Sequence, residues 1–451
     1  MSVLSNAAVV GGAGYQIDNS LRFRASGSAR LSRTPGSAGN RKTWTWSGWV
    51  KRGSLSQTGT IWGSNFASGG FGMAFGNYSG VGVNPQVIGI TLCCVGTVTT
   101  NEVFRDPSAW YHLVARFDST QSSQADRFRL YVNGAQQTLS GNLNVTQNAD
   151  YHINESSRLH VIGGESGYYN DFYMAEINHV DGQSLTPSYF GEQNSDGVWV
   201  PKKYTGTYGN NGFYLPFDDA TSTTTLGYDR SGNGNNWTCN NISLTAGVTY
   251  DHMEDTPTNN YCTLSPIDKN SNASLSDANL TAANGANHAW ANGTQIVTGS
   301  EKYYFECKIS AGTVIGFGLL GAGANKASAN PTDGYYFYCS SSNGAVYANG
   351  SAIFTVNATW GSAANDILQV AYDGTTGKFW IGKNNTWCDS TGGTSGNPGS
   401  GTNVVATLST SAQWFPSVNA NSLTAYLNFG QRPFAFSPPT GFKPLCTSNL
   451  P

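Results

Sequence analysis

Charged side chains are scarce in this chain. They make up 11% of its 451 residues, against about 25% in a typical soluble protein. The formal net charge is −3 and the pI is near 6.1, and no basic run is longer than Arg41-Lys42 or Lys202-Lys203. Nucleic-acid binding needs a clustered excess of Lys and Arg, so this composition argues against it. Solubility must come from neutral Ser, Thr, Asn and Gln, which suits a sugar or protein partner.

Targeting segments and long apolar runs are also missing. The first twelve residues have neither the cationic region nor the apolar length of a signal peptide. No run of ~18 apolar residues is present for a membrane span. We therefore expect a protein without a membrane span that is synthesised and folded in a cytosol, or that leaves it by a route not evident in the sequence.

The eight cysteines show no metal or disulfide pattern. No Cys-x-x-Cys pair occurs, and the adjacent Cys93 and Cys94 cannot share one ordinary metal or disulfide geometry. Cys307 and Cys339 lie in apolar segments, where a cysteine behaves as a small hydrophobic residue. We predict buried, reduced thiols.

Oxygen ligands for a cation gather at one place. Asp218, Asp219 and Asp229 have the chemistry to hold a hard cation such as Ca²⁺. Asparagine-rich turns have the same composition without an ion. The prediction is therefore no metal and no cofactor.

Strand patterns are plentiful. Between 366 and 387, apolar residues alternate with polar or small ones on both sides of a loop at 373–377, which is typical of a β-hairpin. The same pattern occurs over 110–132 and ends in Asn133-Gly134, a strong hairpin-turn signal. Short strands separated by Gly, Asn and Ser turns fill much of the rest, with one short helical turn at 186–193. We predict an all-β protein of two tandem antiparallel β-sandwiches.

Two series of segments carry family resemblances. The segments 43–52, 110–118, 130–134 and 173–177, in this order, resemble the concanavalin A-like lectin/glucanase fold in its laminin G and pentraxin variety. The later segments, which close with Trp414-Phe-Pro and Asn428-Phe-Gly-x-x-Pro-Phe, resemble a SPRY domain. The resemblance implies a jelly-roll sandwich in each case, and for the SPRY-like part a recognition module without chemistry.

These patterns divide the chain into four parts. Residues 1–20 are a short polar arm, 21–205 the concanavalin A-like sandwich and 286–451 the SPRY-like sandwich. Residues 206–285 are an Asn/Gly-rich connector, or they complete the first sandwich. The Asn-, Gly- and Thr-rich composition of 206–285 resembles segments of phage virion and tail proteins that carry laminin G-like domains.

Paired carboxylates are missing where a glucanase of this fold would carry them. Such enzymes have a Glu-x-Asp-x-x-Glu or Glu-x-Asp-x-Glu run, because retaining hydrolysis needs two carboxyls ~5 Å apart. Here Asn178 stands where the partner of Glu176 would lie, and we expect Glu176 to be hydrogen-bonded to backbone. No Gly-x-Ser-x-Gly elbow and no His-x-x-x-His spacing occur. We predict no enzyme activity and no catalytic residue.

Loop clusters of aromatic and amide side chains are the better candidates for a ligand site. Sugars are bound by ring faces together with Asn, Asp and Gln hydrogen bonds. The predicted ligand-binding residues are Trp62, Asn65, Tyr168, Tyr169, Asn170 and Asp171. The alternative is that these rings pack in the core or at a subunit contact.

The sequence thus predicts a non-enzymatic protein on the surface of a bacteriophage virion, a tail-fibre or adhesin component that binds a host surface glycan. We expect a homo-oligomer in contact with other virion subunits, since shallow sugar sites gain affinity by multivalency. The alternative is a structural or decorating protein of the capsid or tail whose sandwiches make protein contacts. A third hypothesis is a glycan hydrolase, which the missing carboxylate pair disfavours.

Overall fold

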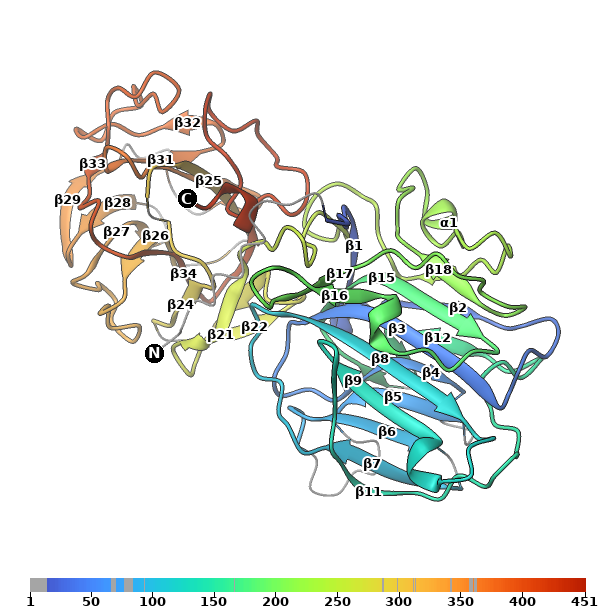
Figure 1. Ribbon diagram of the computed structural model, residues 1–451. Coiled ribbons are helices and arrows are strands. Elements are labelled where there is room, and N and C mark those ends of the chain that lie inside the picture. Colours follow the sequence, from blue (N-terminus) through green and yellow to red (C-terminus); the bar gives the residue numbers. More distant parts are fainter. Residues whose placement is uncertain are drawn as a thin grey trace. The chain divides into compact units, whose positions relative to one another are not determined.

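Strands account for nearly all of the regular structure (Figure 1). The computed structural model describes residues 14–65, 70–76, 84–92, 94–165, 167–285, 288–297, 299–310, 312, 314–340, 343–356, 360 and 363–451. Its large sheets are antiparallel. The predicted all-β class with antiparallel sandwiches is confirmed.

The chain divides into two compact units. In the described part, the N-terminal unit comprises residues 14–245 and 249–258, and the C-terminal unit comprises 246–248 and 259–451. The expected connector, 206–285, is therefore shared between the two units. Of the expected arm, 14–20 belongs to the N-terminal unit, whereas 1–13 lies outside the described residues.

In the described residues, the N-terminal unit forms two large sheets and two small ones. Sheet I runs in the order β10 (Ala135–Gln136), β9 (Phe128–Val132), β8 (Trp110–Asp118), β3 (Thr43–Arg52), β15 (Phe172–Asp181), β1 (Ser20–Phe23) and β20 (His252–Met253), with β18 (Phe213–Leu215) beside β15. Sheet II runs in the order β11 (Leu139–Leu143), β7 (Gly96–Thr100), β6 (Ile88–Leu92), β5 (Phe71–Phe75), β4 (Gly59–Ser64), β12 (His160–Ile162), β2 (Arg30–Arg33) and β19 (Thr238–Asn240). The small sheets are β13 (Gly164–Glu165) with β14 (Tyr168–Tyr169), and β16 (Gly191–Gln193) with β17 (Trp199–Pro201).

The predicted hairpin over 110–132 is formed by β8 and β9. Asn133 and Gly134 have φ values of 49° and 79° and turn the chain from β9 into β10. Asn and Gly tolerate this left-handed region better than other residues. The turn signal in the sequence is therefore confirmed.

Aromatic side chains fill the space between sheets I and II. Trp44 and Trp46 come from β3, and Trp62 of β4 stacks on Trp46 with the ring centroids 5.7 Å apart. The outer face of sheet I is covered as well. Its smaller apolar cluster consists of Val114, Tyr131, Val180, Phe190 and Tyr204.

Two buried carboxylates tie the segment 249–258 to sheet I. The carboxylate of Asp251 pairs with the guanidinium groups of Arg22 and Arg24, at 3.1 and 2.8 Å. The carboxylate of Asp255 pairs with Lys51 Nζ at 2.8 Å. Between these two anchors, β20 extends sheet I beside β1. Because a buried charge is costly unless it is paired, the two ion pairs fix this segment on the sheet.

The described part of the C-terminal unit forms two more large sheets. Sheet III runs in the order β21 (Leu264–Lys269), β24 (Trp290–Gly293), β34 (Trp414–Asn421), β26 (Val314–Gly321), β27 (Gly334–Ser340), β28 (Asn343–Ala348) and β29 (Ser351–Thr355). Sheet IV runs in the order β22 (Ser274–Ser276), β23 (Thr281–Ala283), β35 (Thr424–Asn428), β25 (Lys302–Ile309), β30 (Ile367–Asp373), β31 (Lys378–Lys383) and β32 (Thr386–Trp387), with β33 (Ala406–Thr407) beside β31.

The predicted hairpin around 373–377 is formed by β30 and β31. Phe379 and Ile381 alternate with Trp380 along β31, so they lie on opposite faces of sheet IV. All three are nonetheless buried, because the outer face of this sheet carries an apolar cluster of its own. The members of this cluster, called the outer cluster below, are Tyr304, Ala371, Trp380, Trp387 and Phe442.

Cysteines of the C-terminal unit lie inside the fold. Cys307 and Cys339 are buried on β25 and β27, as their apolar segments predict. Cys388 is buried too, and burial raises the pKa of its thiol to about 12. A thiol with so high a pKa is unreactive at neutral pH.

Helical structure in the described part is limited to short turns. The α-helix α1 (Thr223–Leu226) is capped by Ser222, and the 3-10 turns are η1 (Ala25–Gly27), η3 (Gln124–Asp126), η4 (Pro187–Tyr189) and η5 (Thr447–Asn449). The turn expected at 186–193 is η4, and Thr186 precedes it without making a side-chain cap hydrogen bond. None of the helices in the described ranges is long and apolar enough to cross a membrane.

Candidate functional site

A row of polar side chains on the outer face of sheet IV leads to a pocket. Along β25, Tyr304, Glu306 and Lys308 alternate with core residues and so share the outer face. Lys308 pairs in register with Tyr426 of β35 on one side and with Ile367 of β30 on the other. Tyr304 belongs to the outer cluster, whereas Lys308 lines the pocket.

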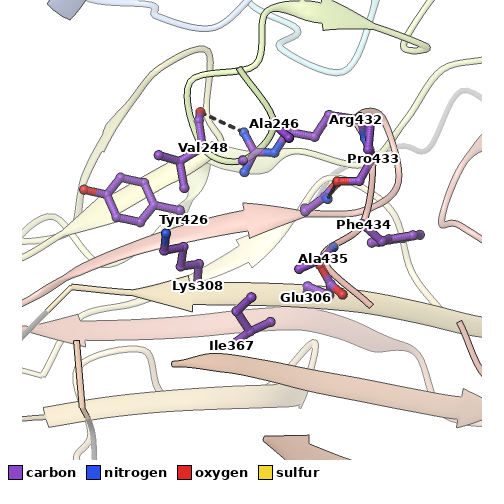
Figure 2. Close-up of a pocket in the computed structure, with 12 residues that line it drawn as sticks. Ala246, Val248, Glu306, Lys308, Ile367, Tyr426, Arg432, Pro433, Phe434 and Ala435 are labelled. Carbon is purple, nitrogen blue, oxygen red and sulfur yellow. Dashed lines mark hydrogen bonds between the residues drawn. The ribbon is translucent and has the colours of Figure 1, made fainter. Parts of the chain in front are cut away.

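The pocket has a volume of about 220 Å³ (Figure 2). Lys308, Ile367 and Tyr426 rise from the sheet into it, and its walls are the segment 432–435 after β35 and the short segment 246–248. Pockets that enclose a drug-sized ligand measure ~300–1,000 Å³. This smaller pocket suits a ligand the size of one sugar ring.

The carboxylate of Glu306 holds the 432–435 wall in place. Its Oε1 accepts hydrogen bonds from the Tyr304 hydroxyl at 2.7 Å and the Phe436 amide at 3.0 Å, and its Oε2 accepts one from the Ala435 amide at 2.9 Å. Burial raises the pKa of this carboxyl, although these donors act in the opposite direction. Glu306 is therefore a structural part of the pocket.

Asn428 and Arg432 complete the wall. Asn428 Nδ2 donates to the carbonyl of Pro433 at 3.0 Å. The guanidinium of Arg432 donates to the carbonyls of Leu427 at 2.9 Å and Val248 at 3.1 Å, and the second bond is dashed in Figure 2. Hydrogen bonds within the C-terminal unit thus fix the shape of the pocket in advance, which lowers the ordering cost of binding.

Lys308 and Tyr426 are the polar side chains of the pocket that remain available to a ligand. Both are half-buried. Over the described ranges, neither the Lys308 ammonium nor the Tyr426 hydroxyl has an ion pair or hydrogen bond to the protein. An aromatic ring, an apolar neighbour in Ile367 and a cationic donor together match the needs of a sugar ring.

Trp62 and Asn65 do not form the loop site that their composition suggested. Trp62 lies within β4 and is fully buried, with its ring against Trp44 and Trp46. Its ring faces are closed to a ligand, so the prediction for Trp62 is wrong. Asn65 follows β4 with a φ of 41°, and its carbonyl accepts a hydrogen bond from the Gly70 amide at 3.1 Å. Its ligand-binding role stays a prediction.

The 168–171 cluster is brought together at the β14 hairpin, but its polar members are mostly occupied. Asn170 and Asp171 are buried. Asn170 Nδ2 donates to the carbonyl of Gln57 at 3.2 Å, and Asp171 Oδ1 accepts from the Ala25 amide at 2.8 Å. These two residues therefore hold neighbouring loops. Tyr168 and Tyr169 are half-buried, and their ligand-binding role stays a prediction.

Glu176 lies at a bulge of β15, where the register with β3 shifts between Ala175 and Asn178. Its φ of 53° is in the left-handed region, which costs about 1–3 kcal/mol. Oε1 accepts from the hydroxyl of Tyr15 and Oε2 from that of Tyr214, both at 2.9 Å. The expectation of a backbone partner was therefore wrong. The carboxylate is bound by two tyrosines, which the sequence could not place together because they lie 199 residues apart.

Glu176 should make the N-terminal unit less stable as the pH rises from about 4.5 to about 7. Burial raises the pKa of Glu176 from 4.5 to about 7, with Tyr15, Tyr214 and Lys203 opposing the rise. Between these values the folded carboxyl keeps a proton that the unfolded chain has lost, so raising the pH favours unfolding. Above about pH 7 the loss is complete, and it amounts to about 3 kcal/mol.

The measurement compares urea denaturation of the wild type and Glu176→Gln at about pH 5 and about pH 8. Burial lowers the pKa of His112 to about 3 and of His160 to about 4, and such histidines stabilise the fold as pH rises. They are present in both proteins, so the difference isolates Glu176. From about pH 5 to about pH 8, the free energy of unfolding of the wild type should fall by about 2–3 kcal/mol more than that of the variant. Equal changes in both proteins would refute the assignment.

The acidic residues proposed for a cation have protein partners. The Asp229 carboxylate accepts from the amides of Tyr214, Ser231 and Asn235, and Asp218 pairs with Arg230 at 2.8 Å. Across the residues that the structure describes, no group of three or more His, Cys, Asp and Glu side chains is placed to hold a metal ion.

The pocket residues were missed because their segments were interpreted only as strands. The available signal was the spacing of Tyr304, Glu306 and Lys308. Three polar side chains at i, i+2 and i+4 share one face of a strand whose other face is apolar. In a sandwich, such a row indicates a polar feature built above the sheet.

Comparisons with known proteins bear on the fold. Residues 25–186 match a family model described as the concanavalin A-like lectin/glucanases superfamily. None of the curated proteins matches the chain. A heptameric SAP-like pentraxin from Limulus polyphemus is 15% identical, with 38% of this chain and 78% of that chain covered and a TM-score of 0.29.

Two other solved structures have similar scores. The SPRY domain of human HERC1 is 13% identical, with 38% of this chain and 99% of that chain covered and a TM-score of 0.29. A Bacteroides ovatus protein described as a candidate carbohydrate-binding protein is 13% identical, with 50% of this chain and 59% of that chain covered and a TM-score of 0.33. The family match and the observed sheets together give the N-terminal unit the concanavalin A-like, laminin G-like lectin fold.

Proposed function

We propose that this protein is a non-enzymatic virion protein of a bacteriophage, and that the pocket of its C-terminal unit binds a glycan of the host surface. The observation that supports this most is how the pocket is built. Its walls are held by Glu306, Asn428 and Arg432, while a tyrosine ring and an ammonium group are left to meet a ligand. A pocket for one ring suits recognition of a terminal or branching sugar.

Several copies acting together would make such a site useful. A single sugar buries little surface and binds weakly, because association itself costs free energy. Linking several sites raises the overall affinity without any new contact. We therefore propose a homo-oligomeric tail-fibre or adhesin component that is exposed on the particle and anchored by other virion subunits.

Removing the Tyr426 ring should weaken glycan binding about 10-fold or more, because the stacking surface is lost. The full-length chain is first screened on a glycan array, and the best ligand is then titrated against wild type and Tyr426→Ala. The matched control is Tyr189→Ala. Tyr189 is 51% exposed in the N-terminal unit, and its removal should leave binding unchanged.

A silent array, or a Tyr426→Ala variant that binds as tightly as the wild type, would contradict the proposal. A silent array with the chain located in the capsid or tail lattice by electron microscopy would favour the structural or decorating role. Release of shortened saccharides from the bound glycan would show a hydrolase.

A further inference from the structure

We propose that the pocket selects a sugar that carries a carboxylate, such as a uronic or sialic acid residue, and that Lys308 binds this carboxylate. The inference rests on the proposed function and adds the class of sugar. It is carried by three observations on the C-terminal unit, which concern the partners of its lysines, the charge of the pocket and the register of two strands.

Lys308 differs from the other lysines of this unit. Each of the others has a partner within the protein. The ion pairs are Lys302 with Asp373, Lys326 with Asp268, Lys383 with Asp366 and Lys443 with Glu301, and the lysines that donate to backbone carbonyls are Lys269 and Lys378. Lys308 is half-buried and has no such partner anywhere in the described ranges. A partly shielded cation without a counter-charge favours an anionic ligand.

The other charged side chains of the pocket are bound to the protein, whereas Lys308 is not. Three charged side chains line it, namely the acidic Glu306 and the basic Lys308 and Arg432. The oxygens of Glu306 accept from two backbone amides and a tyrosine hydroxyl, and Arg432 donates to two carbonyls. The charged groups of Glu306 and Arg432 are thus engaged within the protein, and Lys308 is the side chain that presents its charge to a ligand.

The strand register places this charge beside the aromatic ring. Lys308 and Tyr426 lie directly opposite each other on β25 and β35, and such pairs have Cβ atoms ~4.5–5.5 Å apart. Figure 2 shows both side chains rising on the same side of the sheet. A pyranose ring that lies with its C–H face on Tyr426 therefore brings a carboxylate at its edge to the Lys308 ammonium. The Tyr426 hydroxyl can then bond a sugar hydroxyl.

The test titrates the full-length chain with methyl glucuronide and methyl glucoside, which differ in the carboxylate. The wild type should bind the glucuronide about 10-fold more tightly, as a charge-assisted hydrogen bond allows. Lys308→Met, which keeps the side-chain length without its charge, should bind both sugars with the weaker affinity. Lys308→Arg should keep the preference. Lys443→Met is the matched control, since it removes a half-exposed lysine outside the pocket, and should behave as the wild type.

The outcomes separate the inference from the proposed function. Equal affinity of the wild type for glucuronide and glucoside would overturn the selection and leave glycan binding in place. A preference that survives in Lys308→Met would overturn the role of Lys308. Tighter binding of glucose 6-sulfate than of the glucuronide would assign the pocket to sulfated sugars. It would overturn the inference that the pocket selects a carboxylate. No binding of any sugar here or on the array would overturn the proposed function itself.

Discussion

The Asp251→Ala variant should lose about 3–5 kcal/mol of the free energy of unfolding of the N-terminal unit. The side chains of Asp251 and Arg22 are fully buried, and Arg24 is 12% exposed. Asp251 also accepts a hydrogen bond from the Ser243 amide at 3.0 Å. Removing the carboxylate takes the counter-charge from a buried guanidinium, and the desolvation cost of that charge then falls on the folded state. Asp251→Asn keeps the side-chain shape and one acceptor. Its free energy of unfolding should lie between those of the wild type and Asp251→Ala.

The stability change is read by hydrogen exchange of β3 and β15 in the full-length chain, because these central strands report global opening of their own unit. Asp218→Ala is the matched control. It breaks the Asp218–Arg230 pair, whose side chains are 49% and 35% exposed, and exposed pairs contribute only about 0–1 kcal/mol. If both variants lost the same small amount, the segment 249–258 would not be anchored by its buried charge.

Glu306→Ala should both destabilise the C-terminal unit, by about 2–4 kcal/mol, and abolish binding at the pocket. The buried Tyr304 hydroxyl and two part-buried backbone amides lose their acceptor. A buried donor left without an acceptor costs about 1–3 kcal/mol, and the amides, which water can reach in part, add less. Part of this cost is relieved if the 432–436 segment moves away, but that movement removes the pocket wall. The readouts are urea denaturation and glycan titration of the same variant.

Glu301→Ala serves as the matched control for this prediction. Glu301 pairs with Lys443 at 2.9 Å, and the two side chains are 33% and 46% exposed. Its loss should cost less than about 1 kcal/mol and leave binding unchanged. Glu306→Ala protein that binds glycan normally would show that the wall is not part of the site.

Local patterns explain why the fold was predictable. The hairpins β8–β9 and β30–β31 follow from alternation over a few residues and from Gly or Asn at the turn. The anchoring of 249–258 does not follow in this way. Arg22 and Asp251 are 229 residues apart, and nothing near either residue indicates that they meet. The sequence therefore leaves open whether 206–285 is a connector or completes the first sandwich.

The site was harder to predict than the fold, because residue composition does not tell which face of a strand a side chain takes. Trp62 has the chemistry of a sugar platform, but its position within β4 buries it. Lys308 lies in an apolar strand segment, and nothing near it in the sequence indicates a ligand site. It becomes a candidate only once β35 is beside β25 and the 432–435 segment closes over the sheet. Both facts depend on contacts between distant parts of the chain.

The central claim is that the pocket above Lys308 and Tyr426 binds the glycan. A crystal structure of the full-length chain with its best array ligand tests this most directly. We predict one sugar ring against the Tyr426 ring, with its carboxylate at Lys308 and the 432–435 wall unchanged. A saccharide bound at Tyr168 and Tyr169 with this pocket empty would contradict the account.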